Sequence, residues 1–492
     1  MTNLELEWSM SRLSESVERS MGLLATADLA SDDVVEKLLA ETTDRRRLDL
    51  ADLTPPEQAH LVASRALDVL PSAERLAESI ERAASAGRPL IVKFGIDPTA
   101  EDVHIGHAVP MMVASRLQRM GHRVVFIVGD ITGKIGDPSD RSGERPSLSD
   151  EDIARNLRTY REQVSPFFDF DRAELRHNSE WLAQVRLPEL LGILAQIPVS
   201  ASLQREDFRN RLGQGHGLSM SEFLYSVVMA MDSVAIHCDV EIGGLDQLLN
   251  MQMCRRVMEV VGQPPELVIT TPLIEGTDGT GAKMSKSRGN SVALNSPPEE
   301  IYGRVMSVPD RLAATYLQAL SEWTDVEVAE VVARQEAGTL HPMDLKRIVA
   351  GEVVAAVHGV DAAMRARADF SARFSRRSYA EVETMPVLDL TANGGRRLGE
   401  TLTGVLALTP SISAARRVAE QGGLRLVAEA QGRQDSVTLP VGAVARPVGE
   451  VVAEVVAELR PRADAELYVK VGRKLARITG AAIAPQPGPP AA

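Results

Sequence analysis

The sequence predicts an α/β protein with a doubly wound parallel sheet, followed by a helical domain and a small α+β domain. The first observation is an apolar strand at 90–96 (LIVKFGI), a helical stretch at 104–121 and a second strand at 123–131 (RVVFIVGDI). A strand, a helix and a strand in close succession form a βαβ unit, which implies parallel strands. The other two observations are a helical pattern from 298 to 375 and short mixed elements from 400 to 480.

Residues 1–88 should be helical, because apolar residues recur three and four positions apart in VVEKLLAE and SAERLAESIERAA. VEIGGLDQ (240–247) and LVITTPLI (267–274) look like the ends of later strands, and MPVLDLTANGG (385–395) has no period. We therefore expect a helical N-terminal extension (1–60), a catalytic sheet domain (61–297), a helical domain (298–384), a linker (385–399), a small domain (400–482) and a disordered, proline-rich tail (483–492).

Length and composition limit the class of protein. The chain has 492 residues, of which 44% are hydrophobic and 25% charged, as in ordinary globular proteins. No apolar run is long enough to cross a membrane, and the N-terminus lacks the basic-then-apolar order of a secretory signal. Cys238 and Cys254 are the only cysteines, which argues against a disulfide framework or a structural zinc site. We expect a cytoplasmic protein with no membrane partner.

The charge is unevenly distributed along the chain. The formal net charge is −14, which is unlike that of a protein that coats nucleic acid non-specifically. Residues 1–60 carry 13 acidic and 6 basic side chains, whereas residues 391–480 carry 13 basic and 9 acidic ones. The C-terminal segment is therefore the place where we expect a polyanion to bind.

The first motif is His104-Ile105-Gly106-His107, which follows the first strand and opens a helix. Backbone N–H groups at a helix start point toward an anion, and two imidazoles three residues apart can donate hydrogen bonds to phosphate oxygens. Gly106 would let a flat base approach the backbone closely. Taken alone, the pattern also fits a capped helix with two incidental histidines.

The second motif is Lys283-Met284-Ser285-Lys286-Ser287, within TDGTGAKMSKSRGN. Glycines and small residues predict a mobile loop, and its two lysines can place positive charge on phosphates as a transferring group becomes charged. Taken alone, it also fits a solvated basic loop. The Walker A pattern is absent.

Together, the two motifs resemble those of the class I aminoacyl-tRNA synthetases. GIDPTAEDVHIGH, VGDITGKIGDPSDRSGER, SEFLYSVVMAMDS, VEIGGLDQLLN and GAKMSKSRGN resemble bacterial tyrosyl-tRNA synthetases in order and spacing, and the likeness runs from residue 90 to about 480. The resemblance implies a Rossmann-like catalytic fold and a homodimer. It also implies that ATP and an amino acid form an aminoacyl-adenylate, whose aminoacyl group then passes to tRNA.

The resemblance implies roles for the residues of the two motifs. His104 and His107 would hold the ATP phosphates beside Gly106, and Lys283 and Lys286 would stabilise the departing pyrophosphate. Mg²⁺ would accompany ATP without a dedicated protein site for the metal. The GGLDQ segment would contact the ribose and the amino-acid carboxylate through Gly244, Asp246 and Gln247.

The amino-acid pocket is implied by the same resemblance. Asp137 and Tyr225 match contacts to the substrate ammonium, Asp232 matches the carboxylate that binds a phenol hydroxyl, and Asp97 would support the pocket floor. The family pattern LYxxxQxYD expects glutamine where this chain has Met229, which cannot accept a strong hydrogen bond. Either Met229 is a core residue, or the pocket has changed toward a tyrosine analogue or a β-amino acid.

The basic C-terminal segment resembles the small RNA-binding domain that ends bacterial tyrosyl-tRNA synthetases, and residues 298–375 resemble their anticodon-recognising region. Three functions stay open: a tyrosine–tRNA ligase, a paralogue that activates another amino acid for specialised biosynthesis, and a non-catalytic RNA-binding protein. The expected phosphate contacts to tRNA are Arg416, Arg417, Arg425, Lys470, Arg473 and Lys474.

Overall fold

A computed structural model describes residues 12–139, 148–376, 379, 382, 385–430, 433–462, 464–472 and 474–481. The chain divides into two compact units between Met364 and Arg365, and each is described by itself. In the described part of the chain, no helix is long and apolar enough to cross a bilayer. The expected tail at 483–492 lies outside the described residues.

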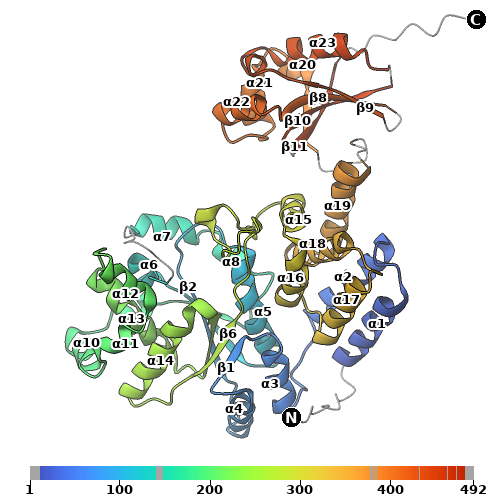
Figure 1. Ribbon diagram of the computed structural model, residues 1–492. Coiled ribbons are helices and arrows are strands. Elements are labelled where there is room, and N and C mark those ends of the chain that lie inside the picture. Colours follow the sequence, from blue (N-terminus) through green and yellow to red (C-terminus); the bar gives the residue numbers. More distant parts are fainter. Residues whose placement is uncertain are drawn as a thin grey trace, which may run out of the picture. The chain divides into compact units, whose positions relative to one another are not determined.

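The first unit contains a six-stranded sheet with the order β1-β6-β5-β2-β3-β4 (Figure 1). The chain runs outward from β2 through β3 to β4, then returns to the other side of β2 to form β5 and β6. These five strands are parallel, which confirms the doubly wound fold class. The strands are β1 Asp68–Leu70, β2 Ile91–Ile96, β3 Arg123–Val128, β4 Glu174–His177, β5 Val240–Gly244 and β6 Leu267–Thr271.

The strand β1 corrects the expectation of helices alone over residues 1–88. It pairs antiparallel with β6, from Asp68 opposite Thr270 to Leu70 opposite Val268. Three residues are too few for a strand period to show in the sequence, so the pairing comes from the neighbouring strand and not from a local pattern.

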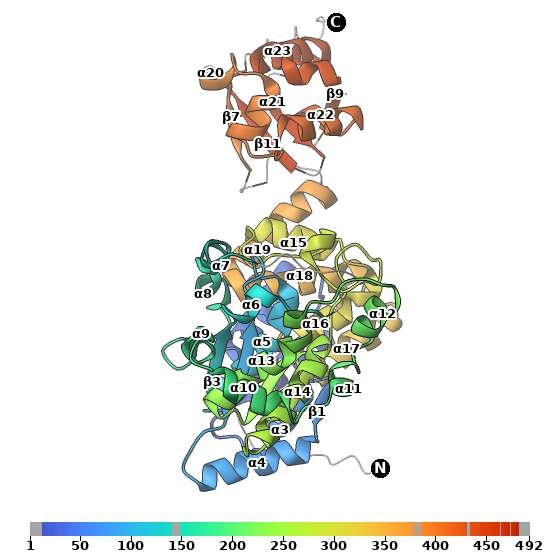
Figure 2. The same cartoon turned by 90° about the vertical axis from the view of Figure 1, so that its left-hand side faces the viewer.

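Helices cover both faces of this sheet (Figures 1 and 2). The βαβ helix α5 packs on one face, and α14 packs on the other, beside α13. The helices of this part are α3 Pro55–Ala63, α4 Ala73–Ser85, α5 Ile105–Arg119, α6 Thr132–Ile135, α7 Asp150–Leu157, α8 Tyr160–Val164, α9 Ser179–Leu182, α10 Leu187–Leu194, α11 Val199–Ser202, α12 Glu206–Gly213, α13 Met220–Ile236 and α14 Leu248–Val260, with the 3₁₀ turns η1 Leu245–Gln247 and η2 Lys286–Arg288.

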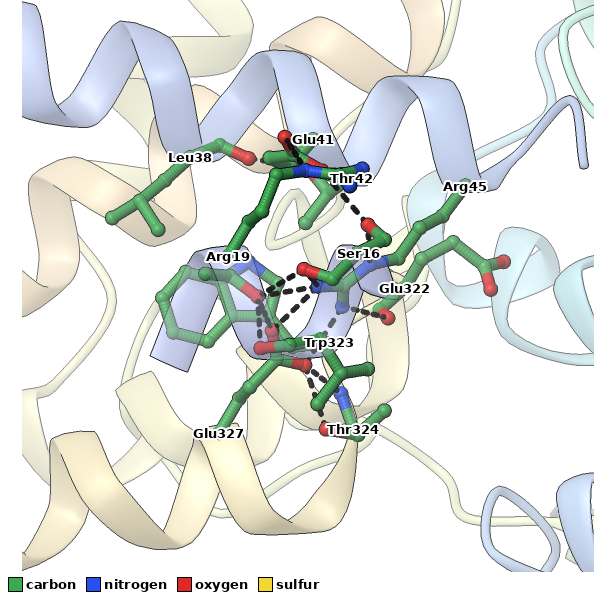
Figure 3. A network of polar contacts seen from close by, with 12 residues as sticks. Ser16, Arg19, Leu38, Glu41, Thr42, Arg45, Glu322, Trp323, Thr324 and Glu327 are labelled. Carbon is green, nitrogen blue, oxygen red and sulfur yellow. Dashed lines mark hydrogen bonds and ion pairs between the residues drawn. The ribbon is translucent and has the colours of Figure 1, made fainter. Parts of the chain in front are cut away.

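The N-terminal extension packs against the helices that follow the sheet. Figure 3 shows Arg45 buried between them, where its guanidinium binds both carboxylate oxygens of Glu327 at 2.7 Å and the hydroxyl of Ser16 at 2.8 Å. Each nitrogen of this buried guanidinium group has a hydrogen-bond partner. The extension is therefore an integral part of the first unit. The helices of this part are α1 Arg12–Thr26, α2 Asp32–Arg45, α15 Pro298–Met306, α16 Ala313–Leu320, α17 Asp325–Glu336 and α18 Pro342–His358, with the 3₁₀ turn η3 Asp310–Leu312. Helix α19 Val360–Phe370 contains the boundary between the two units.

The second unit holds a five-stranded sheet with the order β7-β11-β10-β8-β9 and a core of aliphatic side chains. Its strands are β7 Val387–Asp389, β8 Leu424–Ala430, β9 Arg433–Thr438, β10 Glu466–Val471 and β11 Lys474–Thr479. Its helical elements are the π-helical turns η4 Ser371–Arg376 and η6 Thr401–Val405, the 3₁₀ turn η7 Val441–Ala445, and α20 Leu390–Asn393, α21 Leu398–Glu400, α22 Ile412–Glu420 and α23 Val448–Leu459.

The stretch expected as a linker at 385–399 differs from that expectation. It contains β7, which pairs in parallel with β11, and Leu388 at its centre is fully buried. Burying Leu388 against the second sheet outweighs the breaking tendency of Gly394 and Gly395, which lie beyond the strand. This stretch therefore belongs to the C-terminal sheet.

Candidate active site

One pocket of about 930 Å³ opens at the carboxyl ends of β2, β3, β5 and β6. Successive strands lie on opposite sides of β2, with β3 on one side and β5 on the other. Ligands of doubly wound sheets bind at the carboxyl ends of the strands at such a switch point. The pocket brings together twelve residues expected from the sequence: Asp97, His104, Gly106, His107, Asp137, Tyr225, Met229, Asp232, Gly244, Asp246, Gln247 and Lys283. Lys286 is not part of its lining, since its ammonium donates to the backbone carbonyl of Asp102.

The two histidines begin α5 as a reciprocal cap. The amide of Gly106 donates to His104 Nδ1 at 3.2 Å, and the amide of His104 donates to His107 Nδ1 at 3.3 Å. The rings stack with their centroids 3.8 Å apart. Because both Nδ1 atoms accept hydrogen bonds, the proton of each neutral ring resides on Nε2.

Burial keeps both rings uncharged. Burial, followed by the nearby Lys286 and Lys283, lowers the pKa of His104 to about 4. Burial and His104 lower the pKa of His107 well below its ordinary value. The pair therefore offers two neutral N–H donors at pH 7. A Cβ on Gly106 would lie 2.9 Å from the His104 ring, so only glycine fits between the two histidines.

The lysine loop closes against the same pocket. Glu275 and Lys283 form a β-bridge, and the amide of Ser285 donates to Asn290 Oδ1 at 2.8 Å. Left-handed backbone at Gly281 permits the turn that precedes Lys283. The Lys283 ammonium lies 3.0 Å from Asp246 Oδ2, so the loop spans the pocket from β6 to the turn after β5.

Asp97 and Tyr225 line the pocket and contact one another. The Tyr225 hydroxyl donates to Asp97 Oδ2 at 2.9 Å, and the Thr132 hydroxyl donates to Asp97 Oδ1 at 2.7 Å. Burial, together with the charges of Asp137 and Asp232, raises the pKa of Asp97 to about 7, against the opposing effect of its two hydrogen bonds. A substrate ammonium placed here would restore the ionised form of this carboxyl group.

Asp137 is held by amides from η1 and α14. Gln247 Nε2 donates to Asp137 Oδ2 at 2.6 Å, and Asn250 Nδ2 lies 3.4 Å from Oδ1. Asn250 is in turn held by Arg205, whose guanidinium donates to its Oδ1 at 2.7 Å. Asn250 and Arg205 were not expected from the sequence. Asn250 is the last residue of the segment VEIGGLDQLLN, which carries part of the family resemblance and could have indicated this residue.

Asp232 is buried and also lines the pocket, and its two oxygens have different partners. Trp181 Nε1 donates to Oδ1 at 2.8 Å, and Asn178 Nδ2 lies 3.4 Å from Oδ2. Burial raises the pKa of Asp232 to about 6, with Lys93 and the two hydrogen bonds opposing it. Trp181 and Asn178 were also not expected, because they are more than 50 residues from Asp232 and belong to no motif.

Met229 lies on α13 between Tyr225 and Asp232 and lines the pocket. It also packs against an apolar cluster that contains Val227, Met253 and Val257. The side chain therefore serves as both core and pocket wall, and it offers the ligand a thioether in place of a hydrogen-bonding group.

Comparisons with known proteins decide the family. The family model described as "tRNA synthetases class I (W and Y)" matches residues 85–375. The chain is 40% identical to a tyrosine–tRNA ligase of Geobacter metallireducens over 384 residues, which is 78% of this chain and 94% of that protein. It is 38% identical to a tyrosine–tRNA ligase of Thermotoga maritima over 377 residues, which is 77% of this chain and 91% of that protein. The chain belongs to the class I tRNA synthetase family of the W and Y type.

Solved structures agree on the fold of this synthetase. A C-terminally truncated mitochondrial tyrosyl-tRNA synthetase of Aspergillus nidulans gives a TM-score of 0.53 at 21% identity, covering 69% of this chain and 99% of that one. A tyrosyl-tRNA synthetase of Archaeoglobus fulgidus gives 0.52 at 21% identity, covering 63% and 99%.

The pocket of this class I synthetase has two chemically distinct ends. The histidine donors and Lys283 form a cationic and N–H-rich end that suits a polyphosphate, while the carboxyl groups of Asp97, Asp137 and Asp232 form an acidic end. Such a pocket can hold an anion and a cationic group side by side.

The basic residues expected to bind RNA lie in the second unit. Arg416 and Arg417 are exposed on α22, and Arg425 on β8 is paired directly with Lys470 on β10. Lys470 is half-buried, and its ammonium lies 3.1 Å from the Tyr379 hydroxyl. Lys474 is exposed at the start of β11, and Arg473 lies outside the described residues.

Proposed function

We propose that the chain is a tyrosine–tRNA ligase that uses ATP to form tyrosyl-adenylate and then charges tRNA(Tyr). The observation that carries the proposal is that one pocket is lined by the histidine pair and by three carboxyl groups, of which Asp232 is buried and Asp97 and Asp137 are half-buried. The polyphosphate of ATP suits the first end. Asp137 and Tyr225 suit the ammonium group of tyrosine. Asp232 suits its phenol hydroxyl.

In the first step, the amino-acid carboxylate attacks the α-phosphorus of ATP. A bond forms between a carboxylate oxygen and phosphorus, the bond from phosphorus to the bridging oxygen breaks, and pyrophosphate leaves with that electron pair. No side chain of the protein attacks, so catalysis consists of positioning and charge stabilisation. The Nε2–H groups of His104 and His107 donate to phosphate oxygens, and Lys283 and Lys286 neutralise the departing pyrophosphate. Mg²⁺ arrives with ATP.

The pairing of Lys283 with Asp246 gives the order of events. Asp246 is a suitable acceptor for the ribose hydroxyls of ATP, and its carboxylate also pairs with the Lys283 ammonium. When the ribose occupies Asp246, the lysine is released toward the phosphates. Gly244 and Gln247 belong to the same GGLDQ segment as Asp246. In this proposal they contact the ribose and the amino-acid carboxylate.

In the second step, a hydroxyl of the terminal tRNA adenosine attacks the tyrosyl carbonyl carbon and AMP leaves. The six basic residues of the second unit bind tRNA phosphates, and the helices after residue 298 recognise the anticodon. This proposal places the chain in the cytoplasm, with tRNA.

We propose that the working form is a homodimer. An apolar surface on α10 to α13 leaves large side chains in water: Leu187 is 65% exposed, Val199 60% and Met220 71%. Large apolar side chains left in water on neighbouring segments of the chain are common at protein interfaces, and a second copy of the chain is the occupant that we propose.

A second candidate substrate is a tyrosine analogue or a β-amino acid. Met229 favours it, because this side chain cannot replace a hydrogen bond to a substrate ammonium and leaves room for that group to shift.

ATP–pyrophosphate exchange across a panel of amino acids tests the proposal. Exchange with L-tyrosine, followed by charging of tRNA(Tyr), is the expected result. Exchange with an analogue or a β-amino acid, with little for L-tyrosine, would favour the second candidate. No exchange with any amino acid would refute both.

A further inference from the structure

A buried ammonium group lies beneath the pocket. Lys93 is on β2, is fully buried, and contributes to the pocket lining. Its three N–H donors have three acceptors: Glu241 Oε1 at 2.8 Å, Ser233 Oγ at 2.9 Å and Cys254 Sγ at 3.8 Å. Since an ammonium group has three donors and no acceptor, Lys93 has no donor left for a substrate.

The buried polar groups around Lys93 contain one ion pair, between Lys93 and Glu241. Glu241, Cys254 and Glu266 each place a ligand-type atom within 4.8 Å of the others, and all three are buried. Burial and the charge of Glu241 raise the pKa of Glu266, whereas Lys93 keeps the pKa of Glu241 low despite burial. Glu266 therefore keeps its proton, Glu241 is the counter-charge, and Lys93 supplies the positive charge that a metal ion would otherwise provide.

Lys93 also acts on the neighbouring carboxyl group in the pocket. Asp232 directly precedes Ser233, whose hydroxyl accepts a hydrogen bond from Lys93. The hydrogen bonds to Asp232 come from the neutral side chains of Trp181 and Asn178. Among the charged groups that act on Asp232, Lys93 on β2 attracts its anion and Glu241 on β5 repels it; Asp97 and Asp232 repel one another across the pocket.

We propose that Lys93 is a specificity-determining positioning residue, which holds Asp232 as an anion so that the pocket requires a hydroxyl donor on the aromatic ring of the substrate. The inference rests on the proposed function, because it assigns Asp232 to the phenol end of the ligand. An anionic carboxylate can only accept a hydrogen bond. Beside phenylalanine this carboxylate would keep only the hydrogen bonds from Trp181 and Asn178 and would lose any donor from the pocket, whereas the hydroxyl of tyrosine adds that donor.

The first experiment measures the protonation of Asp232 directly. The protein is labelled with ¹³C at the aspartate carboxyl groups, and the Asp232 signal is assigned by its loss in Asp232→Asn. The test variant is Lys93→Met/Glu241→Gln, which removes the cation and its counter-charge together and so leaves no unpaired buried charge. Because Lys93 acts on Asp232 more strongly than Glu241 does, we expect the titration midpoint to rise by about one pH unit. An unchanged midpoint would overturn the inference.

Ser233→Ala is the matched control. It removes one hydrogen-bond acceptor of Lys93 but keeps the charge, so the Asp232 midpoint should stay at its wild-type value. A shift as large as that of the double variant would mean that packing and not charge sets the state of Asp232, which would also overturn the inference.

The second experiment measures selectivity as a function of pH. Pyrophosphate exchange with L-tyrosine and with L-phenylalanine should show a preference for tyrosine at pH 7 that is about tenfold weaker in the double variant, and recovery of that preference by pH 9. Equal preference in the two proteins at every pH would contradict the role of Lys93. If wild-type protein shows no exchange with L-tyrosine, the proposed function fails, while the carboxyl titration still decides whether Lys93 controls Asp232.

Discussion

The ammonium group of Lys283 lies 3.0 Å from the carboxylate of Asp246, and this ion pair ties the lysine loop to the turn after β5 across the pocket. Both partners are partly exposed, so the pair contributes little to global stability, and its effect is on the position of the loop. The same carboxylate and the same ammonium are each expected to bind a different part of ATP, so ATP binding competes with this ion pair.

Replacing Lys283 with methionine should loosen this loop. Trypsin should then cleave after the exposed Arg288 up to about fivefold faster than in the wild type, since an exposed ion pair is worth at most about 1 kcal/mol. Cleavage is followed by mass spectrometry under native conditions. Lys134→Met is the matched control, because it removes an ion pair with Asp150 outside the loop. Equal cleavage rates in the wild type and Lys283→Met would show that the pair does not hold the loop.

The histidine pair and the second lysine should act on the chemical step. We expect His107→Ala or Lys286→Ala to slow adenylate formation by about 10²-fold or more, as is usual when one donor to a developing charge is removed. The affinity for L-tyrosine should change little, because neither side chain lies at the acidic end of the pocket. Single-turnover kinetics and equilibrium binding of tyrosine separate the two effects, and an equal loss in both would contradict the assignment.

Glu322 should be essential for the stability of the first unit. Its carboxylate accepts from Arg116 at 3.1 Å and lies 3.2 Å from Arg119, both on α5. Burial alone would raise the pKa of Glu322, but the neighbouring arginines outweigh it and lower the pKa to about 2. Glu322→Gln leaves buried guanidinium groups without a counter-charge, so we expect a loss of roughly 3–5 kcal/mol in the free energy of unfolding.

Urea denaturation measures this loss. Glu300→Gln is the control, because Glu300 forms a half-exposed ion pair with Arg304 and should cost less than about 1 kcal/mol. The stabilisation from Glu322 should be complete above its unfolded-state pKa near 4.5 and disappear as the pH falls through about 2. A Glu322→Gln variant as stable as Glu300→Gln would contradict the pairing.

Tyrosine binding should depend on pH through the two carboxyl groups with raised pKa values. Burial raises the pKa of Asp97 to about 7 and that of Asp232 to about 6, so both carboxyl groups are mostly uncharged once the pH falls below 6. The charged forms attract the ammonium and accept the phenol hydroxyl, and the KM for L-tyrosine should therefore decrease several-fold from pH 5.5 to pH 8. In Asp97→Asn, the part of this dependence near pH 7 should be absent. A flat profile in the wild type would be evidence against both assignments.

Much of the fold and the site could be predicted because the signals are local. The βαβ unit is a run of adjacent segments, and the histidines and lysines lie within single motifs. The residues that tune the site could not be found in this way. Trp181 and Asn178 reach Asp232 from more than 50 positions away, and Lys93 meets Glu241 and Cys254 only after β2, β5 and α14 have packed. Likewise β7 exists because β11 offers it an edge, which no local period encodes.

Replacing Met229 with glutamine should increase the affinity for L-tyrosine. Met229 lines the pocket between Tyr225 and Asp232, and a glutamine amide oxygen at this position can accept a hydrogen bond from the substrate ammonium. One such bond is worth about 1 kcal/mol or more, which corresponds to a KM about fivefold lower in pyrophosphate exchange. Met231→Leu, on the same helix in the buried core, is the control and should leave KM unchanged. If Met229→Gln also leaves KM unchanged, the side chain is a packing residue, and the pocket binds the ammonium through Asp137 and Tyr225 alone.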